Sequence, residues 1–139
     1  MTVSVGSTAN DVLDTFQVIN MFRGVRAEDM PPHIYACAQQ TYRSMLATRR
    51  DHSVVLTGHS GSGKSTNVRH LMHFFAVAAG GVHGVLTVER LNAMFAVLDA
   101  FGNSRTPMNT SASRYTSLVS LDFDHAGNVA AVSVQVAPS

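Results

Sequence analysis

The stretch that decides the fold is Gly58-His59-Ser60-Gly61-Ser62-Gly63-Lys64-Ser65. It matches the pattern G-x-x-x-x-G-K-[ST] in full. Glycines at these positions let the backbone take positive φ angles, and because they have no Cβ the backbone N–H groups can come close to phosphate oxygens. The stretch therefore predicts a loop that binds phosphate.

The two residues that end this stretch have separate predicted roles. Lys64 is expected to contact the β and γ phosphates of a nucleotide, where a helix beginning near it adds the positive end of its dipole. The Ser65 hydroxyl is expected to be one ligand of a Mg²⁺ ion that also binds phosphate oxygens. The alternative is that residues 58–63 only connect a strand to a helix, but a chance match in a chain of this length is on the order of one in a hundred or less.

The segments around the loop predict alternating strands and helices. Residues 53–57 form a short apolar run rich in β-branched residues, which predicts a buried strand, and residues 64–79 carry apolar side chains at helical spacing. A helix is also expected from Pro31-Pro32 to about residue 48, and another from Thr87, its N-cap, to Gly102. The apolar face expected for this last helix consists of Leu91, Met94, Phe95, Leu98 and Phe101.

The rest of the chain predicts a loop followed by a hairpin. Residues 103–116 are polar and without periodicity, whereas residues 118–123 and 129–136 alternate around a turn at 125–128. The order strand, glycine-rich loop, helix, helix, loop, hairpin predicts the α/β class.

Composition narrows the class of protein. The chain has 139 residues and a net charge of +1, and only 14% of its residues are charged against about 25% in ordinary domains. The length predicts one small domain or a piece of a larger one. The near-zero net charge argues against a nucleic acid partner, because such proteins usually carry a basic patch. The longest apolar runs are shorter than the roughly 20 residues of a membrane span. The single cysteine, Cys37, predicts no internal disulfide, and the N-terminal residues lack the basic start and apolar core of a signal peptide. Together they favour the reducing cytosol.

Several other residues have a chemical and a structural interpretation. Asp122 follows an apolar run as the acidic residue of a Walker B motif does, and residues 124–127 match D-x-x-G, but a hairpin turn explains both. His70 and His73 have the spacing of a metal-binding pair, although no third ligand is identifiable and a solvated helix flank is favoured. Cys37 is interpreted as a small core residue.

Several blocks resemble, in order and spacing, the nucleotide-binding core of a myosin motor domain. They are Pro31-Pro32-His33-Ile34-Tyr35-Ala36, Tyr42-Arg43-Ser44-Met45-Leu46, the phosphate loop and Leu98-Asp99-Ala100-Phe101-Gly102-Asn103-Ser104. The sequences of these blocks are most similar to those of the class XVIII unconventional myosins. The resemblance implies a P-loop NTPase-type core fragment, with residues 1–20 as a poorly matched N-terminal segment and residues 21–139 as a partial motor domain.

The resemblance gives the loop at 103–116 the role of switch I. Asn109, Ser113 and Arg114 match the family pattern N-x-N-S-S-R-F-G-K. By this resemblance Ser113 is the second hydroxyl on Mg²⁺, and Arg114 pairs with a glutamate of switch II. The cofactor implied is ATP or ADP with Mg²⁺.

Other positions depart from the family pattern. The departures are His59, Ser111, Ala112 and Thr116, which stand where the family has glutamate, asparagine, a serine that helps to pass a proton, and glycine. These changes leave the phosphate cradle intact and weaken parts that hydrolysis needs. The implied function is an ATP-binding fragment of an actin-associated motor or tether with weak or absent hydrolysis, and no catalytic residue is assigned.

The remaining expectations concern the parent protein and the alternatives. The family's adenine-contacting segment is not recognisable near residues 6–14, and switch II and the actin-binding parts are expected after Ser139. The implied partners are ATP and actin filaments, the latter through other parts of the parent, and the implied location is the cytoplasm, in association with the cytoskeleton. The isolated chain is expected to be poorly soluble or partly molten. The alternatives are an actin-tethering scaffold with a structural phosphate loop, and a small stand-alone P-loop kinase or GTPase.

Overall fold

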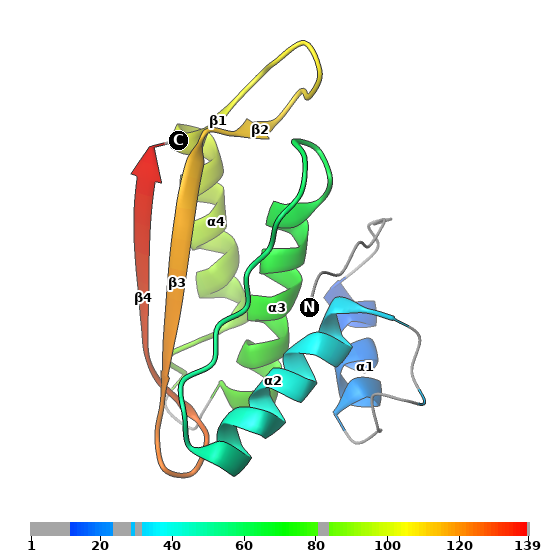
Figure 1. Ribbon diagram of the computed structural model, residues 1–139, viewed down its shortest axis with the longest axis vertical. Coiled ribbons are helices and arrows are strands. Elements are labelled where there is room, and N and C mark those ends of the chain that lie inside the picture. The colour runs from blue at the N-terminus through cyan, green and yellow to red at the C-terminus, as the bar shows by residue number, and fades with distance from the viewer. Residues whose placement is uncertain (1–11, 24–28, 30–31, 81–83, 139) are drawn as a thin grey trace.

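The computed structural model describes residues 12–23, 29, 32–80 and 84–138 and combines helices with antiparallel strands (Figure 1). Its elements are α1 (Val12–Phe22), α2 (Ile34–Thr48), α3 (Lys64–Ala79), α4 (Val88–Gly102), β1 (Asn103–Ser104), β2 (Ala112–Ser113), β3 (Tyr115–Phe123) and β4 (Val129–Pro138). Helix α3 is central, because α1, α2, α4 and β4 all pack against it. The expected mixture of helices and strands is confirmed.

Helices α2 and α4 begin after residues whose side chains cap them. The Nδ1 atom of His33 accepts a hydrogen bond from the backbone N–H of Tyr35 at 3.2 Å, so α2 begins at Ile34. Thr87 caps α4 as predicted, since its hydroxyl accepts from the N–H of Arg90 at 3.3 Å. The predicted helices at 64–79 and after Thr87 are confirmed. The predicted helix ending near residue 48 is also present, but it begins at Ile34 rather than at Pro31-Pro32: Pro32 precedes its N-cap, and Pro31 lies outside the described residues.

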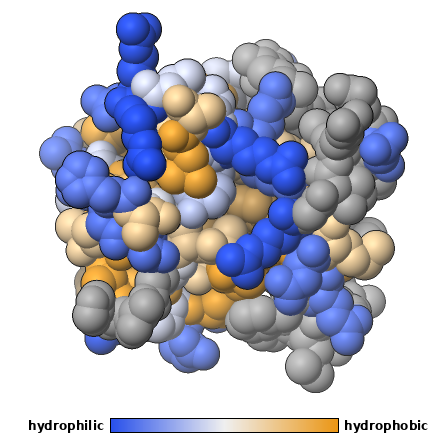
Figure 2. Space-filling model, turned by 90° about the horizontal axis from the view of Figure 1, so that it is seen from below, coloured by the Kyte–Doolittle hydropathy of each residue, from blue (hydrophilic) through white to orange (hydrophobic). Residues whose placement is uncertain are grey.

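The core lies where α1, α2 and α3 meet and continues toward α4 and the hairpin. Phe74 is 1% exposed, and its ring centroid lies 6.1 Å from that of Tyr35 and 5.8 Å from that of Phe75. Burial raises the pKa of Tyr35 to about 12, because the phenolate would lose its water. Figure 2 shows the end of the molecule with the hairpin turn, where hydrophilic residues surround smaller hydrophobic patches.

The predicted hairpin is confirmed. Strands β3 and β4 pair with Leu121 opposite Val132 and Val119 opposite Val134. The turn between them closes through Asp124, whose Oδ1 atom accepts from the N–H of Asn128 at 2.8 Å. Asp122 and Asp124 therefore belong to a hairpin and its turn, which is the structural interpretation. The hairpin is joined to α2 by the Tyr42 hydroxyl, which donates to the carbonyl of Gly127 at 2.7 Å.

The predicted buried strand at residues 53–57 is wrong. This segment runs as coil from α2 to the phosphate loop, and among the described residues no strand pairs with it (Figure 1). Val54 and Leu56 pack against the core, whereas Val55 is 73% exposed. The side chains therefore alternate as in a strand, but a strand also needs a neighbour to accept and donate its backbone hydrogen bonds.

Two smaller expectations also need correction. Phe101 is 90% exposed and does not pack with the apolar face of α4. It lies only about 20° around the helix from Met94, which packs against the core, but it stands in the last turn of α4, beyond the residues of that face that are covered. Residues 103–116 are not loop throughout, since β1 and β2 form a short antiparallel pair within them. Cys37 packs against the core and is partly buried.

Candidate phosphate and magnesium site

The phosphate loop has the backbone conformation that its glycines permit. Gly58, Gly61 and Gly63 have φ angles of 152°, 79° and 85°, a region that side chains disfavour. A Cβ on Gly58 would lie 2.7 Å from the Ser62 hydroxyl oxygen, so a side chain there would require the Ser62 hydroxyl to shift. The loop turns back through the N–H of Ser62, which donates to the carbonyl of His59 at 3.2 Å.

Lys64 begins α3, and its side chain lies over the loop that precedes it. The Nζ atom donates to the carbonyl oxygens of Gly58 and His59, each at 2.7 Å. An ammonium group has three donors, so one remains for an external acceptor. The lysine thus closes the loop and places a positive charge at the N-terminus of a long helix, where anions are favoured.

Ser65 and Ser113 lie in contact although they come from distant parts of the chain. Their hydroxyl oxygens are 3.1 Å apart, one at the start of α3 and the other in β2. Two neighbouring oxygens in an octahedral Mg²⁺ shell with ligand distances of 2.0–2.1 Å are separated by about 2.9 Å. The observed separation of the two hydroxyls therefore fits two adjacent positions of such a shell.

Asn109 joins the second loop to the phosphate loop. Its Nδ2 atom donates to the Ser60 hydroxyl at 3.2 Å, and its Oδ1 atom accepts from the N–H of Ser111 at 3.1 Å. Figure 1 shows the loop before α3 and the loop between β1 and β2 side by side at one end of the molecule. The structure thus brings Ser60 beside Asn109 and Ser65 beside Ser113.

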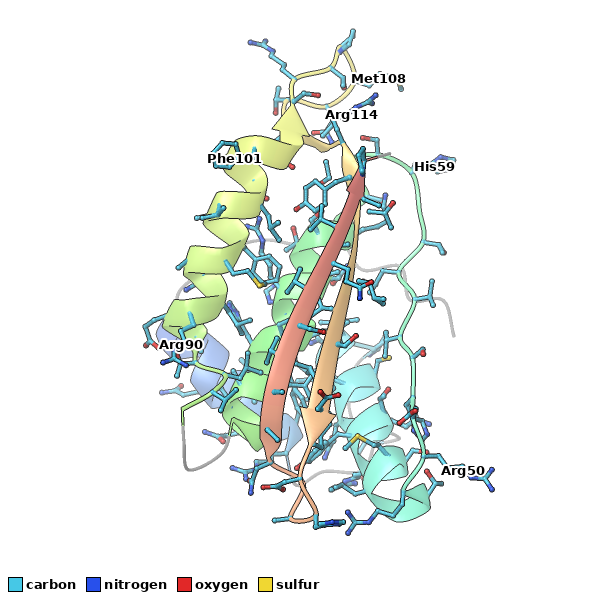
Figure 3. The ribbon with its side chains drawn as sticks, turned by 90° about the vertical axis from the view of Figure 1, so that its left-hand side faces the viewer. Arg50, His59, Arg90, Phe101, Met108 and Arg114 are labelled. Atoms are coloured by element: carbon cyan, nitrogen blue, oxygen red, sulfur yellow. The ribbon has the colours of Figure 1, made fainter. Side chains whose placement is uncertain are left out.

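Arg114 is fixed through its backbone. Its N–H donates to the carbonyl of Gly102 at 2.8 Å, and its side chain is exposed. Figure 3 shows Arg114 at the same end of the molecule as His59 and Met108. Its pairing with a switch II glutamate stays a prediction.

An ion pair between α3 and α4 beside this site was missed by the sequence reasoning. Arg69 pairs with Asp99, and the Nδ2 atom of Asn103 lies 3.4 Å from the Asp99 Oδ1 atom and 3.0 Å from the Ser111 hydroxyl. Burial raises the pKa of Tyr115, and the negative charge of Asp99 raises it further. Helical spacing predicts on which side of its own helix Arg69 or Asp99 lies. It does not predict that these sides of α3 and α4 pack against each other.

The two histidines of α3 have different partners. The Nδ1 atom of His70 lies 3.4 Å from the Tyr35 hydroxyl of α2, and the Nε2 atom of His73 lies 3.1 Å from Asn92 Oδ1 of α4. Within the described ranges no group of three His, Cys, Asp or Glu side chains could hold a metal ion.

None of the described helices is long and apolar enough to cross a membrane.

Comparisons with known proteins follow the same segments. The family model for the myosin head (motor domain) matches residues 6–136. The chain is 52% identical over 120 residues to unconventional myosin-XVIIIa of Mus musculus and 35% identical over 129 residues to myosin-14 of Homo sapiens. It is 34% identical over 115 residues to the non-muscle myosin-2 heavy chain of Acanthamoeba castellanii. The matches cover 86%, 87% and 83% of this chain but only 6%, 6% and 8% of these relatives.

Proposed function

Because the chain belongs to the myosin head (motor domain) family, we propose that residues 58–65 bind the phosphates of Mg·ATP or Mg·ADP in a motor of class XVIII type. Residues 21–139 would then form part of a P-loop NTPase-type core. The parent protein would be a cytoplasmic, cytoskeleton-associated motor or tether that binds actin filaments through parts outside this chain.

The observation that carries the proposal is the contact between the Ser65 and Ser113 hydroxyls at 3.1 Å. These two oxygens would hold the Mg²⁺ ion, which neutralises phosphate charge when it is bound. The free donor of Lys64 would bind a phosphate oxygen, and Asn109 would keep the second loop against Ser60. The nearness of Lys64, Ser65, Asn109 and Ser113 at one end of α3 supports the proposal.

Weak or absent hydrolysis is the finer part of the proposal. Ala112 is 3% exposed and stands where the family has the serine that helps to pass a proton. An alanine there offers no hydroxyl that could pass a proton. The chain would therefore bind nucleotide better than it turns it over.

A structural role for the loop is the second candidate. The two bonds from Lys64 Nζ to loop carbonyls favour it, because the ammonium holds the loop together without any ligand. The parent would then be an actin-tethering scaffold whose phosphate loop no longer needs nucleotide. A small stand-alone kinase or GTPase is not retained as an alternative, because the chain belongs to the myosin head family.

The test is equilibrium binding of a fluorescent ATP analogue to the chain, with and without Mg²⁺. Lys64→Ala removes a charged hydrogen-bond donor, and we expect it to weaken binding at least about tenfold. Arg50→Ala is the matched control, since Arg50 is an exposed cation at the opposite end of the molecule from His59 (Figure 3). Equal binding by the Lys64→Ala variant and the unchanged chain would contradict the proposal, and no binding by either would favour the structural loop.

The actin proposal needs the parent protein rather than this chain. Co-sedimentation of the parent with actin filaments is expected, and a nucleotide-binding motor should release the filaments when Mg·ATP is added. Binding that ignores Mg·ATP would favour the scaffold. A parent that does not co-sediment with actin in either condition would contradict both candidates.

A further inference from the structure

The ends of α3 and α4 nearest the candidate site are held together by one charged contact. Arg69 of α3 forms an ion pair with Asp99 of α4, and both side chains are only about one third exposed (36% and 33%). The Arg69 guanidinium also lies 5.2 Å from the centre of the Phe95 ring, within the range of a cation–π contact. Arg69 is thus fixed on two sides, and through it the helix that begins at Lys64 is tied to α4.

Asp99 also holds the start of the second loop. The backbone N–H of Asn103 donates to the Asp99 carbonyl, and the Asn103 side-chain amide reaches the Asp99 carboxylate at 3.4 Å. The same amide donates to the Ser111 hydroxyl at 3.0 Å. Ser111 lies between Asn109 and Ser113 in the sequence, so this chain of contacts leads from α3 to the two loop residues of the candidate site.

The returning end of the loop is attached to the same end of α4. The N–H of Arg114 donates to the carbonyl of Gly102 at 2.8 Å, and Asn103 pairs with Ser113 across β1 and β2. A Cβ on Gly102 would lie 2.3 Å from the Tyr115 ring, so the ring packs directly against the backbone there. Both ends of the loop therefore depend on where α4 ends.

We propose that Arg69 and Asp99 are positioning residues that keep the Ser113 hydroxyl beside Ser65. The ion pair fixes the end of α4 against α3, Asn103 passes that position to Ser111, and the loop at 103–116 is held over the phosphate loop. The nucleotide-binding part rests on the proposed function. The side-chain contacts of the two residues run to each other, to Asn103 and to Phe95, and no side-chain hydrogen bond joins either of them to residues 58–65.

The simpler reading is a staple between two helices that has no effect on the loop. The two readings differ in what Asp99→Asn does. A staple lowers the stability of the whole chain, whereas a positioning residue also frees the loop while the helices stay folded. The backbone amide of Arg114 separates them, because its bond to Gly102 closes the loop.

The first experiment is amide hydrogen exchange of residues 103–116 in the chain without nucleotide. Asp99→Asn keeps the shape of the side chain and removes its charge, and we expect exchange in the loop to speed up about tenfold, the effect of losing one charge-assisted hydrogen bond. Asp122→Asn, an exposed carboxylate on β3, is the control and should leave the loop unchanged. A lower melting temperature with unchanged loop exchange would overturn the proposal.

A conservative substitution covers the case in which Asp99→Asn does not fold. Arg69→Lys keeps the positive charge but loses the planar fork that suits a carboxylate, so it should speed loop exchange to a smaller extent. Asp99→Glu keeps the charge on a longer side chain and should likewise give an intermediate rate. Exchange at the rate of the unchanged chain in both variants would overturn the proposal.

The second experiment links the ion pair to the metal. We expect Asp99→Asn to reduce the gain in ATP affinity that Mg²⁺ provides by about tenfold, and to cause no further loss in a chain that already carries Ser113→Ala. Equal losses in both backgrounds would mean that Asp99 does not act through Ser113. If the unchanged chain binds no nucleotide, the proposed function fails, and the exchange experiment still decides whether Asp99 holds the loop.

Discussion

Phe74 should contribute more to the free energy of unfolding than any other aromatic residue named above. Its replacement by alanine therefore measures how much the packing of the core contributes to stability. The side chain is 1% exposed and packs between Tyr35 and Phe75. Removing it loses a transfer free energy of about 2–3 kcal/mol. The cavity left behind adds to this, so the free energy of unfolding should fall by about 3–5 kcal/mol.

The assay is thermal unfolding followed by circular dichroism, with Phe101→Ala as the matched control. In a chain of this length Phe74→Ala should lower the melting temperature by about 10–20 °C. Phe101 is 90% exposed, so its replacement should change stability by less than about 0.5 kcal/mol. Equal effects of the two substitutions would refute this description of the core. A chain with no cooperative transition at all would instead agree with the expectation that it is partly molten.

Other predictions concern turns, pH and capping. Gly127→Ala should cost about 2–4 kcal/mol in urea unfolding, because φ there is 88° and the new Cβ would lie 2.8 Å from a leucine side chain of α2. Burial lowers the pKa of both His33 and His70, so the unfolded chain binds more protons and stability should fall as the pH drops below about 6.5. His70→Gln should flatten that dependence in melting curves, whereas His125→Gln in the exposed turn should not. Thr87→Ala removes the cap of α4 and should cost about 1 kcal/mol, and no loss would contradict the capping role.

The parts of the fold with local periodicity could be predicted from the sequence. The helices at 64–79 and after Thr87 and the hairpin around Asp124 repeat apolar residues at intervals that report their own geometry. The segment at 53–57 has the composition of a strand, but pairing depends on a neighbour that composition cannot supply. The prediction that Phe101 is part of the packed face of α4 was wrong for a related reason. Helical spacing shows which residues share a face, but it does not show where the elements that cover that face end.

Only the part of the candidate site that forms a sequence motif could be predicted from its own residues, namely the phosphate loop. Asn109 and Ser113 were identified only through the family resemblance, because nothing in the local sequence joins them to Ser65. Neither the motif nor the resemblance identified Arg69 and Asp99, because their pairing depends on how α3 packs against α4.

The most direct test of phosphate binding uses the fact that Lys64 is the only lysine in the sequence. An amine-acylating reagent should label Lys64 and the N-terminal amine, which serves as an internal reference. At a concentration of Mg·ATP about 100 times the dissociation constant, bound nucleotide should slow labelling of Lys64 about a hundredfold and leave the N-terminal amine unchanged. Labelling of Lys64 at the same rate with and without Mg·ATP would contradict the account.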